Sequence, residues 1–251
     1  MTVVAIIQAR MSSTRLPGKV LLPLANKPVL AHVVERLSHC RLVEKIVVAT
    51  SVDSSDDSIA DFCRENHILF FRGSLEDVLD RYYRAAIENH ADSVVRITAD
   101  CPVIDPVVVD AVITGFLSGN YDLFGLDGEF PDGLDCTVFS LSALKQASLN
   151  AQLKSEREHV GPYIENNPQR FHNGSLKIFK GLQYHRWTLD EPEDYLLLTE
   201  IFEQLYSPDT PFLTYDILKL MQIRPELLSI NHKFMRNEGY LKSIKNDGIY
   251  K

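Results

Sequence analysis

Apolar residues in the first half of the chain alternate between short runs and longer stretches with helical spacing. Val3 to Gln8 is an apolar run rich in β-branched residues, which is typical of a buried strand of a parallel sheet. Pro28 then opens a helix, because proline is favoured in a first turn and the following apolar positions recur at helical spacing. The alternation continues with strands predicted over residues 45–51, 68–71 and 93–98, and with helices around 54–63, over 75–89 and after Asp105-Pro106.

From about Asn120 the pattern loosens. Residues 125–135 are rich in Gly, Asp and Pro and indicate a loop or a strand excursion. We predict a strand over 136–139, helices over 141–153 and 156–166, a strand pair near 176–180 and 184–189, and two late helices. Strands that alternate with helices imply right-handed crossovers, so we expect an α/β fold with a mainly parallel (mixed) sheet flanked by helices on both faces.

Composition limits the class of protein. With 251 residues and 45% hydrophobic residues, the chain can form one well-buried α/β domain. Its apolar runs are far shorter than the roughly 18 residues that cross a bilayer, and its start lacks the order of a signal peptide, so we expect a cytoplasmic protein without membrane insertion. The four cysteines form no C-x-x-C pair, which argues against a zinc site and against a disulfide scaffold.

Charge is distributed unevenly along the chain. A formal net charge of −8 makes a protein that coats nucleic acid improbable, since such binding uses clustered cations. No Asp or Glu precedes Glu35, whereas Arg10, Arg15, Lys19 and Lys27 all lie in that first stretch. The start of this acidic chain therefore carries a local positive field, and we expect a small anion to bind there.

The basic residues lie directly after the first predicted strand, where ligands bind in open parallel sheets. Residues 8–19 combine three cations, three hydroxyl groups and a glycine, a set that can converge on phosphate oxygens. Neither G-x-x-x-x-G-K-[ST] nor G-x-G-x-x-G is present, so this is neither a P-loop nor a dinucleotide-binding loop. An ordinary solvated basic loop is the alternative.

Two aspartates follow other predicted strands. Asp100 comes after residues 93–98 and Asp190 after residues 184–189. Two carboxylates that face a polyphosphate suit Mg²⁺, which takes few protein oxygens and keeps water and phosphate as its other ligands. The alternatives are that Asp190 caps the helix opened by Pro192 and that Asp100 forms a turn before Pro102.

These segments resemble a known family. Ile7-Gln8-Ala9-Arg10 followed by Ser13-Thr14-Arg15-Leu16-Pro17-Gly18-Lys19 is similar to the opening signature of the cytidylyltransferases that make CMP-activated 3-deoxy-manno-octulosonate and acylneuraminate. The closer branch is the spore coat polysaccharide biosynthesis protein SpsF group, and the resemblance covers residues 3 to 205. Shared motifs are Arg72-Gly73-Ser74 with Asp77-Val78-Leu79-Asp80-Arg81-Tyr82, Arg96-Ile97-Thr98 with Asp100-Cys101-Pro102, Pro131-Asp132-Gly133-Leu134-Asp135, Ser155-Glu156-Arg157-Glu158-His159-Val160, and Arg186-Trp187-Thr188-Leu189-Asp190 with Pro192-Glu193-Asp194.

The resemblance implies a GT-A-like nucleotide-diphospho-sugar transferase fold and a role for each motif. Arg10, Arg15 and Lys19 would grip a triphosphate and, with Asp100, form the catalytic set, while Asp100 and Asp190 would hold Mg²⁺. The nucleotide side would comprise Ala9, Ser12, Ser13, Thr50, Ser51, Arg72, Gly73, Asp77 and Thr98. For the acceptor side, on which the resemblance gives no residues, we expect Asp132, Asp135, Glu156, His159 and Arg186. From the residues alone, the turn 156–159 is a charged first helical turn, with His159 as a proton-transfer group if it faces the cleft.

We therefore expect one nucleotidyltransferase domain over residues 1–251, with a nucleotide-binding half (1–120), an acceptor side with the second metal ligand (121–205) and a helical tail (206–251). The implied reaction couples CMP from CTP to a sugar acid or a sugar or polyol phosphate, with release of pyrophosphate, for cell-surface polysaccharide or glycan synthesis. A homodimer is expected, as in relatives.

The acceptor stays open, because Ala99 stands where the sugar-acid members carry glycine and their acceptor-side residues are not recognisable here. Another nucleoside triphosphate could replace CTP. The rival predictions are a GT-A glycosyltransferase that uses a nucleotide-sugar, which usually shows an Asp-x-Asp motif, and a non-catalytic nucleotide-binding protein.

Overall fold

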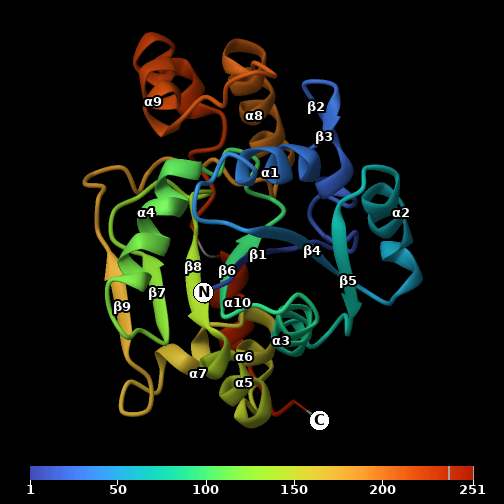
Figure 1. Cartoon of the computed structure of the whole chain (residues 1–251). Helices are drawn as coiled ribbons and strands as arrows, with labels where there is room; N and C mark the ends of the chain where they lie inside the picture. Colours follow the sequence, from blue (N-terminus) through green and yellow to red (C-terminus); the bar gives the residue numbers. More distant parts are fainter. Residues whose placement is uncertain (237, 251) are drawn as a thin grey trace.

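The computed structural model of the protein describes residues 1–236 and 238–250, and the strands within them are as follows. They are β1 (Val3–Gln8), β2 (Pro23–Leu24), β3 (Lys27–Pro28), β4 (Lys45–Ser51), β5 (Leu69–Gly73), β6 (Ser93–Thr98), β7 (Leu123–Leu126), β8 (Thr137–Ser140) and β9 (Asn173–Leu176). Seven of them form one sheet in the order β5-β4-β1-β6-β8-β7-β9 (Figure 1). β8 runs antiparallel to both its neighbours, whereas all other pairs in this sheet are parallel. The predicted mixed, mainly parallel sheet is confirmed.

Different helices cover the two faces of the sheet. The helices are α1 (Val29–Leu37), α2 (Asp57–Glu65), α3 (Val78–Glu88), α4 (Pro106–Leu117), α5 (Leu141–Asn150), α6 (Lys154–His159), α7 (Pro162–Glu165), α8 (Pro192–Leu205), α9 (Thr214–Ile223) and α10 (Glu238–Lys245), with 3-10 turns η1 (Lys19–Leu21), η2 (Ser54–Asp56) and η3 (Pro225–Ser229). Ala5 and Ile7 of β1 pack in one core cluster with α1, α2 and α4, and Val4 and Ile6 in another with α3, α5 and α7 (Figure 1). Successive side chains of a strand point to opposite faces, so the apolar run builds both clusters.

Several predicted boundaries are confirmed because a local signal sets them. β4 and β6 span the predicted residues 45–51 and 93–98. α4 begins at Pro106, and the Asp105 carboxylate accepts hydrogen bonds from the backbone N–H groups of Val107 and Val108. This is the side-chain capping that an aspartate before Pro predicts.

The predicted helix over residues 156–166 is wrong as a single element. α6 ends at His159, Val160 has a φ of 70°, and Pro162 opens the separate helix α7. Proline has no backbone N–H to continue a helix, and a β-branched residue at positive φ interrupts one. Residues on both sides of the break line the cavity that is described below.

The predicted strand pair near 176–180 and 184–189 is also wrong. The strand in this region is β9, which pairs with β7 instead. Residues 185–189 are buried, but their only bridge within the described residues joins Arg186 to Asp132. Their apolar side chains enter a third core cluster rather than a sheet face, so the alternation of polar and apolar residues here does not mark a strand.

This third cluster holds one side of the functional site in place. It joins the β2-β3 hairpin to α8, α9 and η3, and its centre includes the single tryptophan, Trp187, which is buried. The backbone N–H of Leu189 donates to the carbonyl oxygen of Asp100 at 2.8 Å. Residue 190 is therefore fixed next to the carboxyl end of β6. None of the helices in the described residues is long and apolar enough to span a bilayer.

Candidate active site

A cavity of about 600 Å³ lies at the carboxyl ends of β1 and β6. Its wall combines residues 8–20, the end of β6, the turn between α6 and α7, residues 186–190, residue 235 and residues 238–240. This is the edge of the sheet at which open α/β folds bind ligands.

A buried aspartate anchors the basic loop of residues 9–18. Asp56 accepts hydrogen bonds from the Met11 backbone N–H (2.7 Å) and the Ser51 hydroxyl (2.5 Å), so one carboxylate ties the loop to the end of β4. Gly18 then adopts a φ of 70°, which suits glycine, and turns the chain into η1. The first residue of that turn, Lys19, points inward and is buried.

The Lys19 side chain contacts two aspartates, Asp100 and Asp190, that are far apart in the sequence. Its Nζ donates to Asp100 Oδ2 at 2.5 Å and to Asp190 Oδ1 at 2.7 Å. Burial alone would lower the pKa of Lys19, but the two carboxylates outweigh it and raise that pKa. Burial would raise the pKa of Asp100, yet the adjacent ammonium group holds it down to about 2. Lys19 and Asp100 are therefore both charged at neutral pH.

Two arginines fix Asp190 further. Arg15 contacts Asp190 Oδ1 at 2.9 Å. On the other side, Arg186 donates to Asp190 Oδ2 at 3.3 Å, to Asp132 Oδ2 at 3.1 Å, and through a two-bond fork to Asp194 at 2.9 Å each. Asp190 thus has one oxygen held by Arg186 and the other turned to Lys19 and Arg15.

The structure contradicts the interpretation of Asp190 as a helix cap. Glu191 is the N-cap of α8, and Asp194 closes the capping box and accepts from the backbone N–H groups of residues 190 and 191. The Asp190 carboxylate is not used by the helix end. It is available to the cavity.

Two further acids line the cavity near Arg186. Burial and the neighbouring Asp135 raise the pKa of Asp132 to about 7, against the opposing effect of Arg186. Asp135 accepts from Arg236 at 3.1 Å and from the Gly133 backbone N–H at 3.0 Å. A carboxylate that titrates near neutral pH can accept a proton during a reaction.

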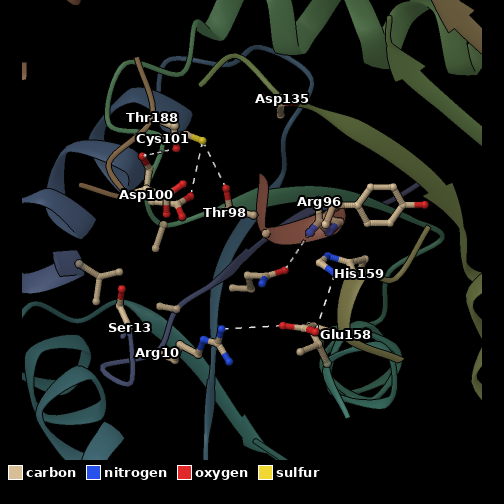
Figure 2. Close-up of a pocket in the computed structure, with 18 of the residues that line it drawn as sticks. Arg10, Ser13, Arg96, Thr98, Asp100, Cys101, Asp135, Glu158, His159 and Thr188 are labelled. Carbon is tan, nitrogen blue, oxygen red and sulfur yellow. Dashed lines mark hydrogen bonds and ion pairs between the residues drawn. The ribbon is translucent and has the colours of Figure 1, made fainter. Parts of the chain in front are cut away.

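A second group of side chains lies apart from Asp100, as Figure 2 shows. Arg10 Nη2 is 3.9 Å from Glu158 Oε1, and His159 Nε2 is 3.8 Å from Glu158 Oε2. The His159 ring meets the ring of Tyr240 edge-on, with centroids 4.9 Å apart. Burial lowers the pKa of His159, and the nearby guanidinium groups of Arg96 and Arg10 add to this effect. The imidazole is neutral at pH 7.

The carboxylates at Lys19 fit a magnesium ion that is completed by phosphate. No cluster of three or more His, Cys, Asp or Glu side chains suited to a metal occurs in the described part of the chain. Asp100 and Asp190 nevertheless converge on one cation, the Lys19 ammonium group. Mg²⁺ at nucleotide sites commonly takes one or two carboxylates and fills its other positions with water and phosphate.

The model of the cytidylyltransferase family matches residues 4–230 of this chain. The chain belongs to the cytidylyltransferase family. Uncharacterized protein MJ1063 of Methanocaldococcus jannaschii is 34% identical to it over 96% of this chain and 98% of that protein. Spore coat polysaccharide biosynthesis protein SpsF of Bacillus subtilis is 34% identical over 79% of this chain and 85% of its own length.

A solved structure agrees with this assignment. A cytidylyltransferase from Leptospira borgpetersenii serovar Hardjo-bovis is 32% identical, superposes with a TM-score of 0.87, and covers 94% of this chain and 100% of its own. The nucleotidyltransferase fold that the resemblance implied is confirmed. As a cytidylyltransferase, this chain is an enzyme of the nucleotidyltransferase class.

Most predicted site residues of the cytidylyltransferase share the cavity. Those that line it are Ala9, Arg10, Ser12, Ser13, Arg15, Lys19, Thr98, Asp100, Asp132, Asp135, His159, Arg186 and Asp190. Those outside its lining are Thr50, Ser51, Arg72, Gly73, Asp77 and Glu156. Their roles in binding and catalysis stay predictions.

The residues outside the lining have visible structural partners. Arg72 donates to the carbonyl oxygens of Ser51 (2.7 Å) and Asp53 (3.0 Å), which holds the loop after β4. Asp77 accepts from the Asp80 backbone N–H and caps α3. Glu156 accepts from two backbone N–H groups at the start of α6 (2.9 and 3.0 Å), so its carboxylate is occupied by the helix end rather than turned to an acceptor.

Several residues line the cavity that the sequence did not single out for a role in the site. Gln8, Arg81, Arg96, Glu158 and Thr188 lie in the shared motifs without such a role, and Glu165 and Tyr240 lie outside these motifs. Arg96 had a signal, because it lies two residues before Thr98 and so on the same face of β6. Tyr240 had no such signal in the sequence, because α10 reaches the cavity only through tertiary packing.

Proposed function

We propose that this enzyme transfers the CMP part of CTP to a sugar acid or to a sugar or polyol phosphate and releases pyrophosphate. The observation that supports this proposal most is the contact of Lys19, at the end of the basic loop, with Asp100 and Asp190 inside an open cavity. A cation flanked by two carboxylates beside Arg10 and Arg15 suits a triphosphate that arrives with a divalent ion. The family match supports CTP as the nucleotide.

In this reaction an acceptor oxygen attacks the α-phosphorus of CTP. A new P–O bond forms while the bond from the α-phosphorus to the pyrophosphate oxygen breaks, and pyrophosphate leaves with the bonding electrons. Arg10, Arg15 and Lys19 hold the phosphate chain and stabilise the charge that builds on the leaving group. The protein mainly positions the two substrates in line.

The fate of the acceptor proton depends on the acceptor. A phosphate acceptor is already ionised and needs no base. A hydroxyl acceptor must lose a proton, and Asp132 and Asp135 are the carboxylates in the cavity wall that we assign to receive it. His159 is a further acceptor-side group.

We assign Mg²⁺ as the cofactor, with Asp100 and Asp190 as the residues that would hold it. When bound, the ion supplies neutralisation of negative charge on the phosphates. Lys19 then exchanges its carboxylate partners for phosphate oxygens. Arg186 keeps Asp190 in position from the opposite side.

The wider setting is proposed from the relatives and from the chain's thiols. The name of the similar SpsF protein supports a role in cell-surface polysaccharide or glycan synthesis. The four cysteines are free and buried, which is compatible with the reducing cytoplasm. We also propose a homodimer, and light scattering of the purified protein tests it.

The function is tested by pyrophosphate release. Purified protein is incubated with Mg²⁺, CTP and a panel of sugar acids and sugar or polyol phosphates, with UTP, ATP and GTP as controls. We expect pyrophosphate and a CMP-linked product with CTP and at least one acceptor. Nucleotide-sugar cleavage without pyrophosphate would instead indicate a glycosyltransferase, and nucleotide binding without any turnover would indicate a binding protein.

A further inference from the structure

Arg81 is a buried cation without a carboxylate partner. It lies on α3 in the cavity wall and is only 1% exposed. Nη1 donates to the Ser74 carbonyl oxygen at 2.6 Å, but the buried Nε has no hydrogen-bond partner. No carboxylate forms an ion pair with it within residues 1–236 and 238–250, and burial lowers its pKa. A buried guanidinium in this state is costly, so it points to an anion that the cavity takes up.

Arg96, on β6, shows the same deficit in the wall of this cavity. Its buried Nε lacks a hydrogen-bond partner, and Nη2 makes one hydrogen bond of 3.2 Å, to the neutral side chain of Gln8. No ion pair to Arg96 occurs in the part of the chain that the structure describes. Next to it in Figure 2 is His159, whose buried Nε2 also lacks a hydrogen-bond partner.

The nearby acids form no hydrogen bond to Arg96 or His159 in the described residues. Glu158 is 3.8 to 3.9 Å from His159 and Arg10, too far for a hydrogen bond. Glu165 lines the same cavity; burial raises its pKa, and the nearby Arg96 opposes this effect. Arg96 and His159 therefore keep unused donor capacity that an anion can fill.

The Lys19 end of the cavity is the opposite case. There Lys19 and Arg15 already contact carboxylates at 2.5 to 2.9 Å. Arg96 precedes Asp100 by four residues, and Figure 2 shows the two side chains apart. The two ends are separate, and the three cations of the basic loop are already assigned to the triphosphate.

We propose that Arg81 and Arg96, with His159, form a second anion-binding subsite that takes the carboxylate or phosphate group by which the acceptor is recognised. This inference rests on the proposed function, because it assigns the rest of the cavity to the nucleotide. Arg81 and Arg96 then determine specificity: they select acceptors with a negative group, and a neutral sugar binds poorly.

The test separates the subsite from the nucleotide site. Protein is saturated with Mg²⁺ and a CTP analogue with a methylene group between its α- and β-phosphorus atoms, which does not react. Sodium acetate and inorganic phosphate are then titrated in separate experiments and followed by NMR. We expect wild-type protein to bind at least one of these anions. Acetate binding favours a carboxylate acceptor and phosphate binding a phosphorylated one.

Arg96→Gln is the test variant and Arg84→Gln the control. Arg84 lies on α3, is mostly exposed and pairs with Asp80 outside the cavity wall. We expect Arg96→Gln to weaken anion binding at least tenfold and Arg84→Gln to leave it unchanged. Arg81→Lys, which keeps the charge but not the fork, is expected to weaken it less than Arg96→Gln does.

Binding of the CTP analogue shows that each variant is folded and distinguishes two failures. If wild-type protein does not bind the analogue with Mg²⁺, the proposed function fails. If wild-type and Arg96→Gln proteins both bind the analogue, but no anion binds or the variant binds it equally well, the subsite is refuted and the proposed function stands.

Discussion

Arg186 offers the most direct test of how this site is held together. It is 7% exposed and contacts three carboxylates, of which Asp194 is fully buried. Arg186→Met keeps much of the side-chain volume but leaves Asp132, Asp190 and Asp194 without their shared cation. Removing one partner of a buried ion pair typically costs about 3–5 kcal/mol. We expect Arg186→Met to lower the free energy of unfolding by an amount in that range.

The expected loss is large compared with total stability, which for most domains is about 5–15 kcal/mol. For a chain of this length, each kcal/mol corresponds to roughly 2–4 °C in melting temperature, so Arg186→Met should melt roughly 6–20 °C below wild type. The single tryptophan, Trp187, is the next residue and is buried. Its fluorescence during urea unfolding reports directly on this region.

Two controls sharpen the measurement. Arg224→Met removes an arginine that pairs with Glu200 and Glu226 but is about one third exposed, and such pairs contribute at most about 1 kcal/mol. Arg186→Lys keeps the charge without the two-bond fork to Asp194 and should lie between Arg186→Met and wild type. An Arg186→Met protein within 1 kcal/mol of wild type would refute the argument that this arginine organises the acids.

Three other variants test separate parts of the site. Asp100→Ala should abolish pyrophosphate release while circular dichroism still shows a folded protein, and wild-type turnover would refute the metal-ligand assignment. Lys19→Ala should weaken CTP binding about 10- to 100-fold, because a hydrogen bond to a charged group contributes about 1.5–3 kcal/mol, and unchanged affinity in calorimetry would contradict the loop's role. Gly133→Ala should cost about 2–3 kcal/mol, because Gly133 has a φ of 103° and a Cβ would lie 2.7 Å from the Trp187 carbonyl carbon. Gly248→Ala, where a Cβ meets nothing within 4 Å, is its control in urea unfolding.

The sequence predicts the first half of this fold well because the signals there are local. The apolar run of β1 and the Asp105-Pro106 cap specify their elements within a few residues. It also predicts that Asp100 and the basic loop meet, since the carboxyl ends of neighbouring parallel strands lie at one edge.

The later half depends on contacts that no local pattern encodes. Polar and apolar residues alternate within residues 185–189 as in a strand, but Trp187 and Leu189 are buried because α8 and α9 cover them. Residues 238–240 of α10 line the cavity only through tertiary packing, which no local sequence pattern encodes. The break at Gly161-Pro162 is different, because the proline itself is a signal in the sequence. The prediction of one continuous helix gave more weight to the helical periodicity on both sides of this proline.

The pairing of Lys19 explains how an acidic chain keeps a phosphate site ready. Asp100 and Asp190 would repel each other at this separation without a cation between them, and Lys19 supplies one in the absence of substrate. In the proposed function, a triphosphate that arrives with Mg²⁺ would offer a phosphate partner for Lys19 and a cation for the aspartates at the same time. Each charge would then exchange one partner for another, so that binding would leave no charged group buried alone. On this proposal, the basic loop and the two aspartates depend on each other both before and after the nucleotide binds.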